Sequence, residues 1–101
     1  MRLTLQFFDG CPNWHVARER LGEALRGFGR DEASVELQRV ESEEDAERLS
    51  FRGSPTILID GRDPFAVADA PVGFSCRVYV TDDGFDGSPS VAQLREVLAG
   101  R

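Results

Sequence analysis

The N-terminal stretch of the chain places a cysteine between a strand and a helix. In residues 2–8 apolar and polar side chains alternate, which is typical of a β-strand with one buried face. Asp9 and Gly10 end that strand. Pro12 suits the first position of a helix, because the N–H that proline lacks would be unpaired there anyway. Cys11 is therefore expected at a helix N-terminus.

The rest of the chain continues the alternation of strands and helices. A strand–helix–strand unit favours a parallel pair, and two later strands in succession favour a hairpin. The order predicts an α/β fold with a four-stranded mixed sheet, helices on both faces and strand 56–59 at the centre. The expected elements are a strand at 2–8, a helix at 12–28, a strand at 34–40, a helix at 42–49, strands at 56–59 and 76–80, and a final helix opening at 88–90.

Length and charge limit the classes of partner. The 101 residues suit a single domain over residues 1–101. With 18 acidic and 12 basic residues the net charge is −6, which argues against nucleic acid and anionic membranes as partners. No apolar run approaches a membrane span of about 20 residues, and no signal peptide is evident. Two cysteines are too few for a secreted disulfide scaffold, so we expect a cytoplasmic protein of open oligomeric state.

The position of Cys11 favours a reactive thiol. A helix N-terminus stabilises a thiolate and lowers the cysteine pKa from its ordinary value of about 8.5. His15 lies on the same helix face and is a candidate partner for the thiolate, whereas Asp9 would repel negative charge. In the alternative interpretation Cys11 is a small buried hydrophobic residue and His15 an exposed helix residue.

The second cysteine, Cys76, opens the predicted strand 76–80 at the end of the sheet opposite Cys11. Pairing of the two would require the connection at 61–75 to bend back, since disulfide Cα atoms lie within about 7 Å. That connection is long and contains several apolar residues, which favours a packed flap. Cys76 is therefore either a second thiol or a buried strand residue.

Other chemistries lack a sequence signal. The Asp-Gly pairs of the chain are typical of turns. One histidine and two separated cysteines do not give the spacing of a zinc site, and neither a phosphate-binding loop nor a hydrolase motif is present. We therefore expect no metal and no cofactor.

The order of elements, a cysteine after the first strand and the segment Gly53-Ser54-Pro55-Thr56 resemble the thioredoxin-like superfamily. The resemblance implies a cis Pro55 facing a reactive Cys11. It also implies that Ser54 offers backbone hydrogen bonds to an extended substrate. The fourth position of the family's Cys-x-x-Cys motif is Trp14 here, so the chain is a single-cysteine variant and Trp14 becomes a residue of the core or of the site wall.

This resemblance implies a thiol-dependent redox protein, with the question of enzymatic activity open. Cys11 would be the nucleophile that attacks a disulfide, a peroxide or another electrophile. Cys76, glutathione or another protein would resolve the intermediate. The partners expected are a protein or small-molecule thiol or disulfide and an external reductant.

Two alternative functions belong to other classes of protein. The segment from Gly53 to Arg77 also resembles short bacterial proteins described as alkylmercury-lyase-like. That resemblance implies two thiolates, Cys11 and Cys76, that bind a soft metal, with Asp9 as the acid that protonates carbon. The second alternative is a non-catalytic binding module that keeps the peptide-binding proline.

Overall fold

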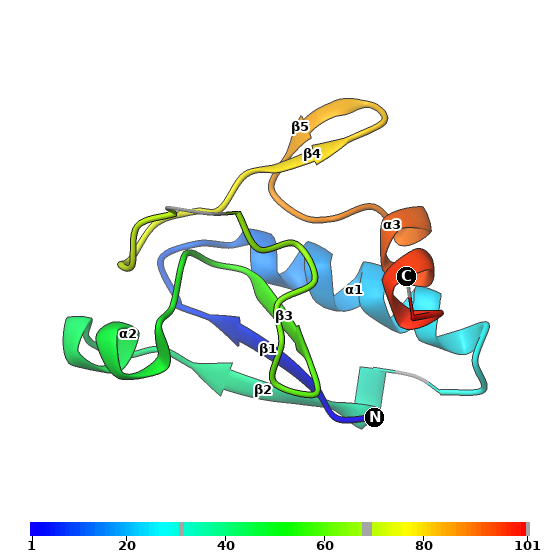
Figure 1. The fold of residues 1–101 in the computed structure, drawn as a ribbon, viewed down its shortest axis with the longest axis horizontal. Coiled ribbons are helices and arrows are strands. Elements are labelled where there is room, and N and C mark those ends of the chain that lie inside the picture. Colours follow the sequence, from blue (N-terminus) through cyan, green and yellow to red (C-terminus); the bar gives the residue numbers. More distant parts are fainter. Residues whose placement is uncertain (31, 68–69, 101) are drawn as a thin grey trace.

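A computed structural model describes residues 1–30, 32–67 and 70–100 of the chain (Figure 1). The three expected helices form within these residues, whereas the strand expected at 76–80 is shorter and is followed by a strand that the sequence did not predict. Within the same residues no helix is long and apolar enough to cross a membrane. The elements are β1 (Leu3–Phe7), α1 (Asn13–Arg26), the 3-10 helix η1 (Glu32–Ser34), β2 (Val35–Arg39), α2 (Glu43–Leu49), β3 (Thr56–Ile59), β4 (Tyr79–Thr81), β5 (Gly84–Asp86) and α3 (Val91–Leu98).

The predicted four-stranded mixed sheet is wrong. β1, β2 and β3 form a three-stranded sheet in the order β2-β1-β3, and β4 pairs only with β5 in a separate hairpin. The expected parallel pairing of β1 with β2 is present, and β3 runs antiparallel to β1. At the end of β3 the N–H of Ile59 donates to the carbonyl of Arg62 at 2.8 Å, and the N–H of Arg62 donates to the carbonyl of Ile59 at 3.0 Å. The last residue of β3 is thus hydrogen-bonded to the turn that follows it. The chain then leaves the sheet, so β4 forms away from β3.

The central strand is β1, and not residues 56–59 as predicted. All five residues of β1 are buried, so the expected single buried face is also wrong. Leu3 and Leu5 face the main core. Gln6 on the opposite side is buried as well, and its side-chain amide donates to Gln38 on β2 at 2.8 Å. This hydrogen bond offsets the cost of burying the amide group.

The main core lies between the sheet and the pair of helices α1 and α3. Apolar side chains recur at helical spacing on both helices, and this burial provides most of the stabilisation that short helices need. The start of α3 is fixed by a capping box between Ser90 and Gln93. Phe28, the last residue of the helix expected at 12–28, is exposed because α1 ends at Arg26. The buried residues of this core are Leu3, Leu5, Ala17, Leu21, Ala24, Leu25, Val35, Ile57, Leu94 and Leu98.

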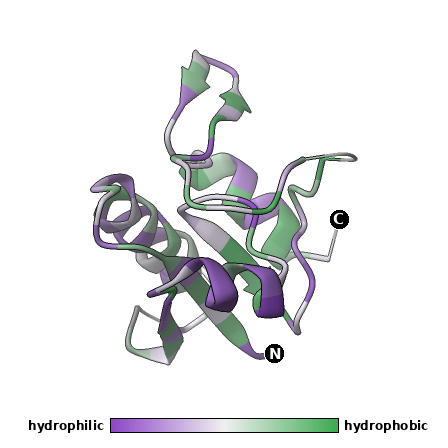
Figure 2. Ribbon diagram, turned by 90° about the vertical axis from the view of Figure 1, so that its left-hand side faces the viewer, coloured by the Kyte–Doolittle hydropathy of each residue, from purple (hydrophilic) through white to green (hydrophobic). Residues whose placement is uncertain are grey.

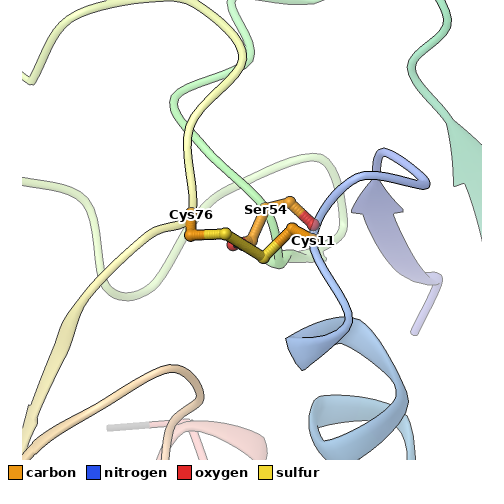
Figure 3. The surroundings of a disulfide bond; sticks show 3 residues. All are labelled: Cys11, Ser54 and Cys76. Carbon is orange, nitrogen blue, oxygen red and sulfur yellow. A yellow bond between two sulfur atoms is a disulfide. The ribbon is translucent and has the colours of Figure 1, made fainter.

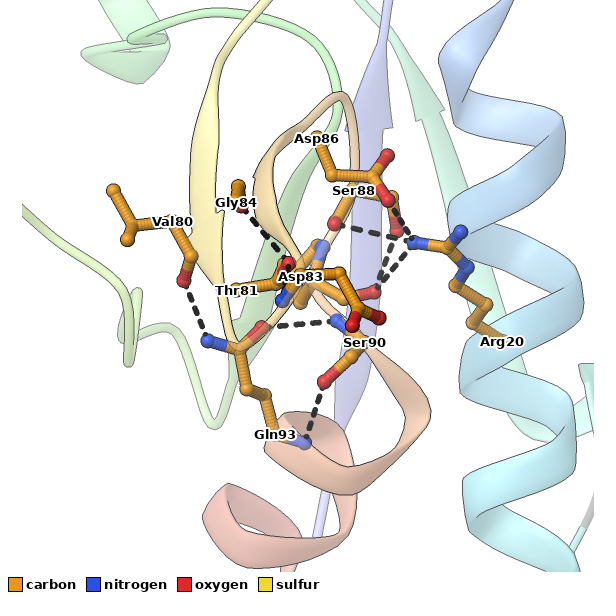
Figure 4. A network of polar contacts seen from close by, with 10 residues as sticks. Arg20, Val80, Thr81, Asp83, Gly84, Asp86, Ser88, Ser90 and Gln93 are labelled. Carbon is orange, nitrogen blue, oxygen red and sulfur yellow. Dashed lines mark hydrogen bonds and ion pairs between the residues drawn. The ribbon is translucent and has the colours of Figure 1, made fainter.

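The hairpin of β4 and β5 projects from the rest of the molecule (Figures 1 and 2). Two polar side chains tie it to the helices, as Figure 4 shows. The guanidinium of Arg20 on α1 donates to Asp86 at 3.1 Å and to two backbone carbonyls that follow the hairpin. The side-chain amide of Gln93 on α3 donates to the carbonyl of Val80 at 2.8 Å. The hairpin is thus anchored although it lies outside the sheet.

The anchor at Asp86 predicts an acid-sensitive hairpin. The hydrogen bond from Arg20 lowers the pKa of Asp86 below its ordinary value. A carboxyl whose pKa is lower in the folded than in the unfolded state stabilises the folded state at pH values above its unfolded pKa. This stabilisation is lost as the pH falls below about 4. We expect the free energy of hairpin opening, measured by amide hydrogen exchange corrected for intrinsic rates, to fall between about pH 5 and pH 3.

The control for this prediction is a second carboxyl on the same hairpin. Asp86→Asn should remove the pH dependence of hairpin opening, whereas Asp83→Asn, which changes a residue of the turn, should retain it. An Asp86→Asn variant with the wild-type pH dependence would show that the anchor is not electrostatic.

Candidate functional site

The two cysteines meet at the start of α1. Cys11 and Cys76 are joined in a disulfide with their Cα atoms 5.8 Å apart, inside the usual range for such a bond (Figure 3). The sequence placed Cys76 in a strand at the far end of the sheet. That placement is wrong, because the connection after β3 bends back and leaves Cys76 ahead of β4. Residues 68 and 69 of this connection lie outside the described residues.

A short backbone pairing brings Cys76 to Cys11. The N–H of Ser54 donates to the carbonyl of Ser75, and the N–H of Arg77 donates to the carbonyl of Ser54, both at 2.8 Å. These two bonds form an isolated parallel bridge between Ser54 and Cys76. The backbone groups of Ser54, which were expected to bind an extended substrate, are therefore already used by residues 75–77 of the same chain.

Gly53 permits this close approach. Its φ of +115° is a conformation that L side chains rarely adopt. A Cβ built at this position would also lie 3.2 Å from the carbonyl oxygen of Ser75 and 3.1 Å from the Cβ of Arg77. Only glycine satisfies both the backbone conformation and the contact with residues 75–77.

Arg77 fixes the backbone that follows Cys76. Its side chain is 9% exposed and forms an ion pair of 2.6 Å with Asp63. The same guanidinium donates to the carbonyl of Phe65 at 2.6 Å. A largely buried arginine is tolerated because a carboxylate and further acceptors satisfy it. The pair therefore ties the long connection to the segment that carries the second cysteine.

Tyr79 holds the same segment from its other end. Its hydroxyl donates to the carbonyl of Pro55. Burial raises the pKa of Tyr79 above its ordinary value, so the hydroxyl keeps its proton and remains a donor. Arg77, Asp63 and Tyr79 were not predicted from the sequence to be parts of the site. In residues 76–80 Arg77 and Tyr79 alternate with apolar residues, and this pattern could have indicated that the two side chains lie on the same face.

The two cysteines differ in exposure. Cys11 is 0% exposed, because the start of α1 and the segment at Ser54 enclose it. Its Sγ lies 3.6 Å from the carbonyl oxygen of Ser54. Cys76 is exposed, so the alternative in which it is a buried strand residue is wrong. A reagent in solvent can therefore reach the disulfide only from the side of Cys76.

Two further site features lie beside Cys11. The Ser54–Pro55 peptide bond is cis, the conformation that the resemblance implied. The hydroxyl oxygen of Ser54 is buried and has no hydrogen-bond partner among the described residues. No side chain caps the N-terminus of α1, which begins two residues after Cys11, so the first N–H groups of the helix have no side-chain acceptor.

The remaining predicted residues sit around the start of α1. Trp14 stacks on Phe7 with ring centroids 4.1 Å apart and on His15 at 3.8 Å. Trp14 is half-buried against the core, as a wall residue would be, and His15 is exposed. The carboxylate of Asp9 pairs with Arg39 at 3.3 Å. Asp9 is therefore not a free charge beside the disulfide.

A metal site is not assembled within residues 1–30, 32–67 and 70–100, where no three His, Cys, Asp or Glu residues are grouped closely enough to hold an ion. The trio considered for a soft metal, Cys11, Cys76 and Asp9, is thus not gathered in this structure.

Comparisons of the chain with protein-family models, with curated proteins and with solved structures find no match.

Because Gly53 lies so close to residues 75–77, we expect Gly53→Ala to push that segment, and Cys76 with it, away from Cys11. Gly29→Ala is the matched control, because Gly29 also has a positive φ of +74° but nothing within 4 Å of the added Cβ. A left-handed conformation costs a non-glycine residue about 1–2 kcal/mol. We expect Gly29→Ala to cost about that much in urea unfolding, and Gly53→Ala to cost clearly more.

The same pair of variants reports on the disulfide. Gly53→Ala should slow formation of the Cys11–Cys76 bond in a glutathione redox buffer, followed by intact mass after acid quenching. Gly29→Ala should form the bond at the wild-type rate. Equal rates in all three proteins would mean that the pairing of Ser54 with residues 75–77 does not control the approach of the cysteines.

Proposed function

We propose that this chain is a thiol–disulfide redox protein in which Cys11 and Cys76 alternate between disulfide and dithiol. The observation that carries the proposal is the joined pair of one enclosed and one exposed cysteine. A purely structural disulfide needs no such asymmetry. In an exchange site the asymmetry directs an incoming thiolate to one sulfur only.

The exchange runs through a mixed disulfide on Cys76. A thiolate from a partner attacks the Sγ of Cys76, forming a new S–S bond while the Cys11–Cys76 bond breaks and Cys11 leaves as thiolate. A second partner thiol attacks the partner sulfur of this mixed disulfide and releases Cys76. Two partner thiols are oxidised to one disulfide, and their two protons end on Cys11 and Cys76. The reverse sequence reduces a partner disulfide.

The surroundings of Cys11 suit a leaving group. The uncapped start of α1 directs backbone N–H groups and the positive end of the helix dipole towards this part of the chain. The buried hydroxyl of Ser54 is a free donor on the neighbouring segment. The helix N-terminus favours negative charge on Cys11 when the disulfide opens. The carbonyl oxygen of Ser54, 3.6 Å from the Sγ of Cys11, can then accept a hydrogen bond from Cys11 once the released thiolate is protonated. The segment Gly53-Ser54-Pro55-Thr56 beside Cys11 supports the proposal through the resemblance to thioredoxin-like proteins. That resemblance assigned the attacking sulfur to Cys11, whereas here Cys76 is the sulfur that meets the partner and Cys11 is the sulfur that leaves.

Single-cysteine variants test this division of roles. Cys11→Ser retains the exposed thiol, and Cys76→Ser retains the enclosed one. With glutathione disulfide at neutral pH, we expect the folded Cys11→Ser protein to form a mixed disulfide at least about tenfold faster than folded Cys76→Ser. Intact-mass kinetics measure both rates, and circular dichroism confirms that each variant is folded.

Unfolded protein supplies the control for intrinsic reactivity. In concentrated urea both variants should react at similar rates, because burial no longer separates the thiols. A faster reaction of folded Cys76→Ser than of folded Cys11→Ser would refute the assigned roles. A wild-type disulfide that glutathione cannot reduce in the folded protein, or a dithiol that glutathione disulfide cannot reoxidise, would refute the redox function itself.

A further inference from the structure

Apolar side chains point to solvent on both sides of the hairpin turn. Arg77 and Tyr79 face inwards through their bonds to Asp63 and Pro55. Because side chains alternate along an extended chain, Cys76, Val78 and Val80 share the opposite face. The sulfur of Cys76 is bonded to the enclosed Cys11, whereas Val78 and Val80 are exposed to solvent. We name these three residues, together with Phe85, which pairs with Val80 across the hairpin, the apolar row.

The apolar row reverses the usual pattern of a strand at a protein surface. Val78, Val80 and Phe85 are 63%, 69% and 82% exposed, whereas the charged Arg77 is enclosed. Figure 2 shows the projecting hairpin, with hydrophobic and hydrophilic residues mixed along its strands. Adjoining exposed apolar side chains of this kind mark interaction sites. The row is continuous with the exposed half of the disulfide, because Cys76 is its first member.

The backbone at Cys76 has an open edge. In a parallel bridge the bonds to Ser54 come from the residues on either side, Ser75 and Arg77. The N–H and C=O of Cys76 itself therefore project from the opposite edge of the segment. An extended polypeptide can add to such an edge by main-chain hydrogen bonds, with alternate side chains against the protein.

Acidic residues lie beside the chain segments that precede and follow the apolar row. Asp82 and Asp83 are exposed in the turn beyond Val80. Val72 and Gly73, which precede Cys76 in the chain, line a depression together with Glu43 and Glu47 of α2. Among the ion pairs of the described residues, none involves these four carboxylates. Basic groups at the two ends of a bound segment would complement them.

We propose that the apolar row binds the redox partner as an extended polypeptide segment, with the partner cysteine opposite Cys76, apolar residues at alternate positions and basic residues at both ends. The proposal rests on the proposed function, since the partner thiol is the thiol that attacks Cys76 and is oxidised. The anchoring of the hairpin by Arg20 and Gln93 holds the row in place before binding, which lowers the entropic cost of docking.

The test compares a peptide thiol with glutathione on the oxidised wild-type protein. The peptide has a central cysteine, valines at alternate positions and two lysines at each end. The readout is the ratio of the second-order rate constants for opening the Cys11–Cys76 bond, peptide over glutathione, each corrected for the thiolate fraction of the reagent. We expect a ratio of at least about 10 for wild type.

Variants of the apolar row test whether its side chains cause the faster reaction of the peptide. Val80→Thr combined with Phe85→Thr should bring the ratio close to 1, and both residues are exposed enough for the fold to survive, as circular dichroism would verify. Phe28→Ser is the matched control, because Phe28 is 44% exposed beyond the end of α1, and it should keep the wild-type ratio. Asp82→Asn with Asp83→Asn should lower the ratio for the lysine-ended peptide but not for a serine-ended one.

The outcomes separate the two proposals. If glutathione opens the disulfide but the ratio is near 1 in wild type or unchanged in the Val80/Phe85 variant, the docking surface is refuted while the redox function stands. If neither thiol opens the bond in the folded protein, both proposals fail. Concentration-dependent dimerisation of the wild type that Phe85→Thr abolishes would assign the row to a second copy of the chain and also refute the docking proposal.

Discussion

The pairing of Ser54 with residues 75–77 is the interaction on which the candidate site depends. Two backbone hydrogen bonds of 2.8 Å hold a segment from the second half of the chain against the turn that precedes β3. Gly53 makes the approach sterically acceptable, and the enclosed ion pair of Arg77 fixes the direction in which the chain continues. The meeting of the cysteines and the position of the apolar row after Cys76 follow from this contact.

This contact also changes the chemistry that a resemblance alone would assign. The edge at Ser54, where an external substrate strand was expected, carries the chain's own residues, and Cys76 occupies the place beside Cys11. A partner must therefore approach from the outer side, where it meets Cys76 first. Cys11, enclosed at the start of α1, is better placed as the sulfur that leaves and later closes the bond again.

Local patterns in the sequence predicted the three helices and the first three strands, but not β5 and not how the second half of the chain joins the first. Pro12, Ser42 and Ser90 mark helix starts that the structure contains, because caps and first-turn residues act within a few positions. The sheet was mispredicted because the apolar strand 56–59 was placed at the centre, where β1 is found. The path of the connection at 61–75 depends on a long-range pair, Arg77 with Asp63, that no local pattern encodes.

The most direct test of the account is site-resolved alkylation of the freshly reduced, folded protein. A short pulse of iodoacetamide at neutral pH, followed by peptide mapping, measures the labelling rates of Cys76 and Cys11 in the same molecules. We expect Cys76 to label at least about tenfold faster, and the difference to vanish in urea. Faster labelling of Cys11 in the folded state would contradict the enclosed position of Cys11 and, with it, the proposed direction of attack.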